Sequence, residues 1–228
     1  MESVGRGLKE LLKTIEEKQE ATKKQAEAFI RELEEEISEL MKRRMFAVDL
    51  TLEPETAHPE LILSDDGKQV KHGDVEKNLQ NNPERFSNCL CVLTKQSFSS
   101  GRFYFEVQVE GKTHWFLGVI RESVNRKKII SWSPQNGYWI IWLTNGNEYL
   151  ALDDSPVDLS VKSGPQKVGV FVDYEEGVVS FYDVEAAALI YSFTGCSFTE
   201  KLFPFFHPGL NDDGINSAPL IISPLGVN

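Results

Sequence analysis

The chain has 228 residues, an apolar fraction of 41% and a formal net charge of −11, a composition typical of a globular protein with one or two domains. Residues 1–45 hold 11 of the 35 acidic and 10 of the 24 basic residues, which leaves 24 against 14 for the remainder. Residues 46–228 are therefore strongly acidic. We expect no nucleic-acid ligand for them, because nucleic-acid binding rests on clustered Lys and Arg. The chain has neither a run of ~20 apolar residues nor a secretory signal, so we expect no membrane association and a cytoplasmic location.

The first predicted element is one long helix over residues 1–44. Residues 6–44 contain no proline, and no glycine after Gly7, while Glu, Lys, Ala, Leu and Gln dominate, all of them strong helix formers. Apolar residues recur in steps of three and four, with polar Gln19 and Thr22 in the middle of the stripe. A stripe of about five heptads favours a coiled coil with another chain, and the alternative is a helix packed on its own domain. The apolar members of the stripe are Leu8, Leu12, Ile15, Ala26, Ile30, Leu33, Ile37 and Leu40.

After Arg44 the apolar residues alternate or form short blocks that are separated by turn residues. Asn145-Gly146 and Glu176-Gly177 are strong tight-turn signals between two such blocks. The pattern predicts an all-β protein, a two-sheet antiparallel β-sandwich over residues 45–228, preceded by the α-helix. The expected strands are 61–64, 89–94, 102–109, 114–121, 138–143, 148–152, 167–174, 178–183, 189–193, 204–207 and 219–222.

Catalytic and metal-binding patterns are absent from the sequence. The odd cysteine count argues against a disulfide scaffold, and Cys89 and Cys91 are expected to be core thiols on one face of a strand. The four histidines show no metal-ligand spacing, and no nucleophile elbow or phosphate loop occurs. The basic residues Arg126–Lys128 are interpreted as a solvated surface. We therefore expect no catalytic residue, no metal and no cofactor.

Five blocks in order carry a resemblance to a known family. Residues 49–59, 101–107, 115–119, 172–175 and 202–206 resemble the successive motifs of the PRY-SPRY domain, as in Val172-Asp-Tyr-Glu175. With the preceding helix, the chain resembles the C-terminal half of tripartite-motif (TRIM) proteins, and the helix resembles the coiled coil of fish-type members. The resemblance implies a protein-recognition module, with a possible role in innate antiviral immunity. Glu53 and Phe105 depart mildly from the family pattern, which has Asp and Trp there.

The zinc domains that precede the coiled coil in TRIM proteins have no counterpart here. Residues 1–57 contain no Cys and no His, whereas a RING or B-box needs four such ligands for each metal. Since the family's ubiquitin-ligase activity resides in the RING, we expect this chain not to be an enzyme, and we interpret it as a partial gene product, splice form or fragment. Expected partners are a protein ligand and a second chain, as a homodimer or a hetero-oligomer with TRIM relatives. The alternative function is a substrate-adaptor or dominant-negative subunit of a RING-type ligase.

Binding is expected in the end loops, where aromatic anchors can be exposed. By alternation, Tyr138, Ile140 and Trp142 share one face of a strand and Trp139 lies on the other. The resemblance implies that Trp142 lines a ligand groove. In antibody-binding members the positions of Phe116, Thr144 and Leu210 hold an acidic residue, Trp and Phe, so antibody binding is not expected. The candidate protein-binding residues are Phe116, Trp132, Tyr138, Trp142, Thr144, Asn145, Leu210, Asn211 and Asp212.

Overall fold

The computed structural model describes residue 10 and residues 13–31, 45–80, 82–128, 131–161 and 164–224. The chain divides into two compact units, residues 1–42 and residues 43–228, and each is described by itself. Among the described residues, no helix is both long and apolar enough to span a membrane.

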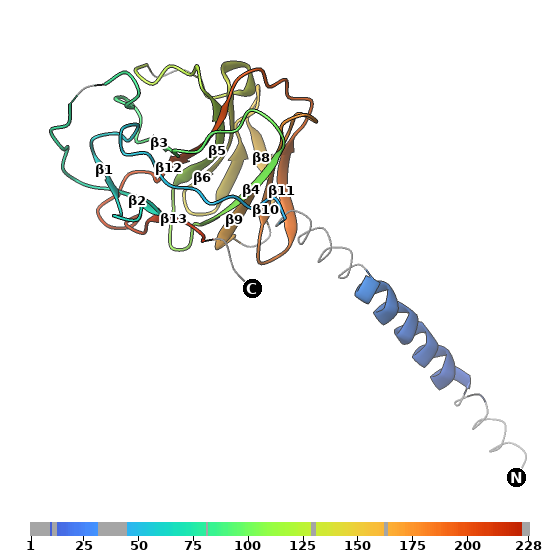
Figure 1. Cartoon of the computed structure of the whole chain (residues 1–228). Helices are drawn as coiled ribbons and strands as arrows, with labels where there is room; N and C mark the ends of the chain where they lie inside the picture. The colour runs from blue at the N-terminus through green and yellow to red at the C-terminus, as the bar shows by residue number, and fades with distance from the viewer. Residues whose placement is uncertain are drawn as a thin grey trace, which may run out of the picture. The chain divides into compact units, whose positions relative to one another are not determined.

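The first unit contains a helix over residues 13–31 (Figure 1). Its described side chains are all exposed, and i,i+4 ion pairs join Lys13 to Glu17 and Glu20 to Lys24. Ile15 and Ile30 of the apolar stripe are therefore free to contact another surface. The helix is confirmed over these residues, its pairing stays a prediction, and the remaining stripe positions, Leu8, Leu12, Leu33, Ile37 and Leu40, lie outside the described residues.

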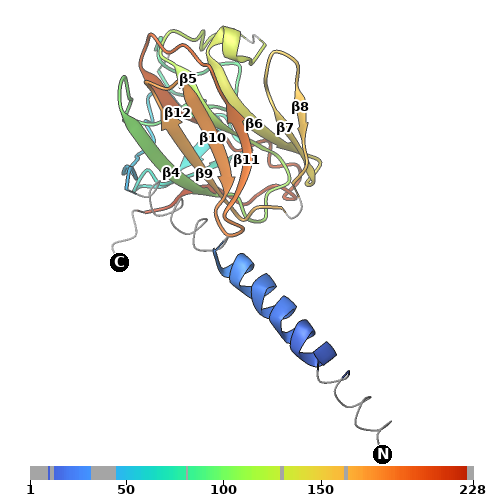
Figure 2. The same cartoon turned by 90° about the vertical axis from the view of Figure 1, so that its right-hand side faces the viewer.

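The second unit is the predicted antiparallel sandwich (Figures 1 and 2). Within the described ranges, one sheet has seven strands in the order β1-β2-β13-β4-β9-β10-β11, and the other has six in the order β3-β12-β5-β6-β7-β8. Figure 2 shows β4, β9, β10 and β11 of the first sheet in front of the second. The bounds are β1 Leu61–Leu63, β2 Gln69–His72, β3 Val92–Leu93, β4 Arg102–Gln108, β5 Trp115–Arg121, β6 Tyr138–Thr144, β7 Glu148–Ala151, β8 Val157–Leu159, β9 Lys167–Asp173, β10 Val178–Asp183, β11 Ala188–Phe193, β12 Leu202–His207 and β13 Leu220–Ile222.

The main core lies between the two sheets, and strand alternation builds it. On β4, Phe103, Phe105 and Val107 are buried in this core, and on β5 Trp115, Leu117 and Val119 are buried in the same cluster. Successive side chains of a strand point to opposite faces, so the alternate side chains of β5, which include Phe116, face away from this core. That second face of the six-stranded sheet carries its own apolar cluster and the candidate site.

The segment before β4 attaches to both sheets. Isolated bridges join Ala47 to Tyr104 of the seven-stranded sheet and Leu52 to Thr94 at the end of β3. The Thr56 hydroxyl donates to the Glu53 carbonyl at 2.8 Å and accepts the Leu93 N–H at 3.0 Å. Residues 47–56 are thus part of the folded sandwich, because their polar groups form hydrogen bonds with backbone groups at the short strand β3.

Four local features differ from the sequence expectation. Strands β2 and β8 and a 3-10 turn over Pro134–Asn136 were not predicted, because their short segments are polar and lack a clear alternation. Conversely, β3 covers only Val92–Leu93, and the Cys91 N–H donates to the Cys89 carbonyl at 2.7 Å in a turn around Leu90. The two cysteines therefore do not lie on a strand, and the turn places their sulfur atoms in contact.

Candidate protein-binding site

Three aromatic residues from adjacent strands form a row on the second face of the six-stranded sheet. The register places Phe116 of β5 opposite Trp142 of β6 on one side and opposite His207 of β12 on the other. The rings of Phe116 and Trp142 are stacked, with centroids 5.0 Å apart and an interplanar angle of 13°. The His207 ring meets Phe116 edge-on at 4.9 Å. Such offset or edge-on pairs hold flat rings in fixed positions next to a surface.

Strand β6 has the two faces that alternation predicts. Trp139, Ile141 and Leu143 belong to the main core, whereas Tyr138 and Ile140 belong to the second cluster. Tyr138 is almost fully buried there, and burial raises its pKa to about 12. It therefore supports the site from below rather than standing out as a surface anchor.

A cavity of about 400 Å³ opens beside this row, within the size range typical of ligand pockets. Trp132 forms part of its wall: its ring packs edge-on against Phe116 at 4.8 Å and lies at 5.9 Å from His207. Of the predicted binding residues, the cavity brings together Phe116, Trp132, Tyr138 and Leu210. The other lining residues are Phe86, Asn88, Cys89, Leu90, Cys91, His114, Asn125, Arg126, Lys128, Phe205 and His207.

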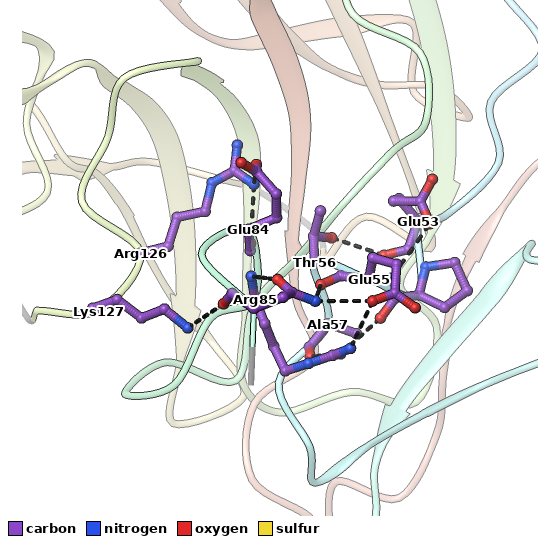
Figure 3. Close-up of polar contacts among 10 residues, drawn as sticks. Glu53, Glu55, Thr56, Ala57, Glu84, Arg85, Arg126 and Lys127 are labelled. Atoms are coloured by element: carbon purple, nitrogen blue, oxygen red, sulfur yellow. Dashed lines mark hydrogen bonds and ion pairs between the residues drawn. The ribbon is translucent and has the colours of Figure 1, made fainter. Parts of the chain in front are cut away.

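One wall of the cavity is fixed by a polar network that begins at Arg85 (Figure 3). The buried guanidinium donates to the carbonyl oxygens of Pro54 and Ala57, both at 2.8 Å, and pairs with Glu55 at 3.2 Å. The next residue along the chain, Phe86, lines the cavity. A charge-assisted bond to two carbonyls is among the stronger hydrogen bonds in proteins, so Arg85 holds Phe86 in place.

The basic cluster at residues 126–128 closes the same wall. Figure 3 shows Arg126 reaching Glu84, with which it forms an ion pair, and Lys127 donates to the Asn82 carbonyl at 2.7 Å. Arg126 and Lys128 line the cavity. The cluster was interpreted as a solvated surface, and the structure corrects this for Arg126 and Lys127, because both tie one loop to another.

Asn216 holds the loop of residues 208–216 at the other rim. Its Oδ1 accepts the Thr113 N–H at 3.0 Å, while its Nδ2 donates to the carbonyls of Pro208 at 3.1 Å and Leu210 at 2.8 Å. The amide is buried, so these bonds replace contacts with water. Sequence reasoning missed Asn216, because one asparagine in a polar loop carries no pattern that distinguishes it.

The remaining predicted residues lie around this rim and do not line the cavity. Trp142 is connected to the cavity through two lining residues. It stacks on Phe116, and its ring centroid lies 5.9 Å from that of His114. Thr144 ends β6, and Asn145 lies in the turn that follows, where its amide donates to Glu148 at 3.0 Å. The Asn211 N–H donates to Nδ1 of His72 at 3.1 Å, and Asp212 is exposed beside it.

His207 is neutral at the pH of a cell, because burial and the nearby His114 lower its pKa to about 3. Its Nδ1 accepts the N–H of Gly209 at 3.0 Å. Gly209 has φ +76°, and a Cβ atom there would lie 2.5 Å from the His114 carbonyl oxygen, so this approach requires glycine. Since Nδ1 uses its lone pair in this bond, the ring hydrogen of the neutral imidazole sits on Nε2.

Among the described residues, Cys89, Cys91 and His207 form one group of potential metal ligands, with ligand atoms within 4.8 Å of one another. The sequence did not predict this group, because His207 is distant from the cysteines along the chain. In the conformation described, however, neither nitrogen of His207 has a free lone pair, and two sulfur atoms alone do not complete a zinc site.

The fold defines a class of protein: a two-sheet antiparallel β-sandwich with a cavity beside its six-stranded sheet. Residues 50–98 match the SPRY-associated domain (PRY) and residues 102–218 match the SPRY domain. The chain therefore belongs to the PRY-SPRY family, whose domains bind protein ligands.

Several curated relatives share this domain. The chain is 42% identical to human pyrin over 224 residues, which is 96% of this chain and 29% of pyrin. It is 49% identical to nuclear factor 7, brain, of Xenopus laevis over 75% of this chain and 28% of that protein. It is 48% identical to the mouse E3 ubiquitin-protein ligase TRIM21 over 78% of this chain and 38% of that protein. The chain thus spans between a quarter and two fifths of these relatives.

Solved structures show the same fold. The TRIM65 PSpry domain superposes with a TM-score of 0.69 at 22% identity, covering 81% of this chain and 94% of that domain. Stonustoxin superposes with a TM-score of 0.67 at 24% identity, over 78% of this chain and 29% of the toxin.

Proposed function

We propose that the chain is a recognition module that binds an apolar or aromatic side chain of a protein ligand in the cavity between Phe116, Trp132 and Leu210. The observation that carries this proposal is the half-buried aromatic floor formed by Phe116 and Trp132. Phe116 is held from both sides by Trp142 and His207, so it offers a rigid ring at little cost in conformational entropy. Leu210 stands at the rim with 61% of its surface exposed, where a partner would cover it.

The charges around the cavity rim favour a ligand segment that is uncharged or weakly acidic. Arg126 is already paired with Glu84, so Lys128 supplies the remaining positive charge in the described lining. Two imidazoles with lowered pKa, His114 and His207, add polar groups without charge. An apolar floor with few polar groups around it is typical of a recognition pocket.

We further propose that the helix pairs two chains and that the module acts in the cytoplasm, in innate antiviral recognition. Pairing would present two pockets to a repetitive target and raise the apparent affinity. Ile30 lies on the apolar stripe and is 53% exposed, whereas Phe29 is 61% exposed and lies off it. Ile30→Asp is expected to convert a dimer into a monomer in sedimentation, and Phe29→Asp is expected to leave the dimer intact. A wild-type chain that sediments as a monomer at micromolar concentration contradicts the pairing.

Binding through the pocket is tested with a matched pair of surface variants. Leu210 and Leu189 are exposed to similar extents, 61% and 57%, but Leu189 lies on β11 of the other sheet. Affinity capture from cells is compared for wild type, Leu210→Asp and Leu189→Asp. The proposal expects proteins that are lost with Leu210→Asp and kept with Leu189→Asp. Identical sets of captured proteins from all three chains contradict it.

A further inference from the structure

We propose that Cys89 and Cys91 form a redox-active dithiol in the wall of the cavity, which exchanges with low-molecular-mass disulfides such as oxidised glutathione. The structure places the two sulfur atoms in contact, and their Cα atoms are 5.2 Å apart, within the range that a disulfide spans. The turn in which the Cys91 N–H donates to the Cys89 carbonyl holds the two side chains together. This inference does not depend on the proposed ligand.

The pair is poorly suited to a structural role. A disulfide that joins residues two positions apart closes a very short loop, so it removes little chain entropy from the unfolded state and adds little stability. Disulfides that are not structural staples are the ones that open and close with the redox state of their surroundings. The local turn keeps the thiols adjacent in either state.

Solvent accessibility decides which of the two cysteines reacts first. Both cysteines line the cavity, but Cys89 is half-buried, whereas Cys91 has 0% of its surface exposed and belongs to the second apolar cluster. Cys89 is therefore the thiol that an incoming disulfide can reach, and Cys91 is the resolving thiol behind it. A ring nitrogen of His207 lies within 4.8 Å of both sulfur atoms.

The exchange proceeds in two balanced steps. The Cys89 thiolate attacks one sulfur of oxidised glutathione, which forms a mixed disulfide and releases one glutathione thiolate. The Cys91 thiolate then attacks the Cys89 sulfur, which forms the intramolecular disulfide and releases the second glutathione thiolate. Two cysteine thiols are oxidised, one glutathione disulfide is reduced to two thiols, and the two protons pass to the released thiolates.

Cys196 provides an internal control. It is the one cysteine outside the pair, it is half-buried, and burial raises the pKa of its thiol to about 11. Since the thiolate is the reactive form, Cys196 is expected to react far more slowly with disulfides and alkylating agents.

The test is a redox titration of the full chain in glutathione buffers, followed by rapid alkylation and mass spectrometry. The free thiols of the wild type are expected to fall from three to one as the buffer becomes oxidising, and those of Cys196→Ser from two to none. Cys91→Ser is expected to keep one glutathione on Cys89, and Cys89→Ser to form no intramolecular disulfide. Reduced Cys89 should be alkylated at least about tenfold faster than Cys196.

Two results would overturn the proposal. One is a wild-type chain that retains three free thiols in a fully oxidising glutathione buffer, or in which Cys196 is the modified residue. The other is stoichiometric retention of Zn²⁺ by the reduced chain that is lost in both Cys89→Ser and His207→Gln, because the cluster would then be a metal centre. Thermal melts of the reduced variants show whether each one is folded, so a folding defect is not mistaken for a lost reaction.

Discussion

Phe116 and Trp142 lie opposite each other on β5 and β6, and their rings are stacked 5.0 Å apart at an angle of 13°. The pair links the cavity wall to a tryptophan that does not line the cavity itself. Trp142 thus acts as a support that fixes the orientation of Phe116, and its indole Nε1 is buried without a hydrogen-bond partner among the described residues.

The stack should appear as coupling in a double-mutant cycle. We expect Phe116→Leu and Trp142→Leu each to lower the free energy of unfolding, and the double variant to lose less than the sum by ~0.5–1.5 kcal/mol, because the stacking is lost only once. Urea unfolding of the four chains measures this. A cycle between Phe116→Leu and Tyr191→Leu, on the other sheet, serves as the additive control. Additivity in the first cycle would show that the stack contributes nothing beyond burial.

Arg85 should be more important for stability than any exposed ion pair of the sandwich. Arg85→Met removes the donor to the carbonyls of Pro54 and Ala57 and is expected to cost ~2–4 kcal/mol, because these buried acceptors lose their partner. Lys201→Met breaks the exposed pair with Glu122 and is expected to cost less than ~1 kcal/mol. Denaturant midpoints compare the two, and equal losses would contradict the role of Arg85.

Asn216→Asp should loosen the rim that carries Leu210. The substitution replaces an amide donor by a carboxylate that faces the carbonyls of Pro208 and Leu210, and we expect a loss of ~2–4 kcal/mol. Hydrogen exchange at residues 208–215 should become faster by a larger factor than elsewhere. Asn147→Asp, in the exposed turn after β6, is the control. Unchanged exchange in the loop would show that other contacts hold it.

Much of the fold could be predicted because β-strand alternation and turn residues are local signals. The two faces of β6 followed directly from the spacing of Tyr138 and Trp139, and the five motif blocks identified the family. The polar support could not be predicted: Arg85 and Asn216 act through backbone carbonyls that are distant along the chain. The group formed by Cys89, Cys91 and His207 was missed for the same reason, since β3 and β12 become neighbours only in the folded sheet.

Acid should destabilise the domain through the partly buried imidazole of His207. The pKa of His207 in the folded state, about 3, is below its unfolded value of ~6.5, so the folded state binds fewer protons between these values. Stability is therefore lost as the pH falls from 6.5 towards 3, by at most ~1.4 kcal/mol per pH unit for this residue. His207→Gln keeps an acceptor near Gly209 and should reduce the slope of unfolding free energy against pH by about one proton. An unchanged slope below pH 6 would contradict the assignment.

Lys112 should produce a dependence of the same sign in the alkaline range, because its pKa is also lowered in the folded state. Its ammonium is buried, donates to the Ala218 carbonyl at 2.8 Å, and has a pKa that desolvation lowers to about 8. The folded state binds fewer protons than the unfolded chain between pH 8 and ~10.5, so stability is expected to rise through this window by up to ~3 kcal/mol. Above pH 10 the raised pKa values of Tyr138 and Tyr191, about 12 each, oppose this gain, because the folded state resists their ionisation. Unfolding free energies at pH 8.0 and 9.5 are compared in a Cys196→Ser background, because the Cys196 thiol, with its pKa raised to about 11, would oppose the rise in this window. Adding Lys112→Met to this background should remove the rise. If the variant keeps the same rise, another group is responsible.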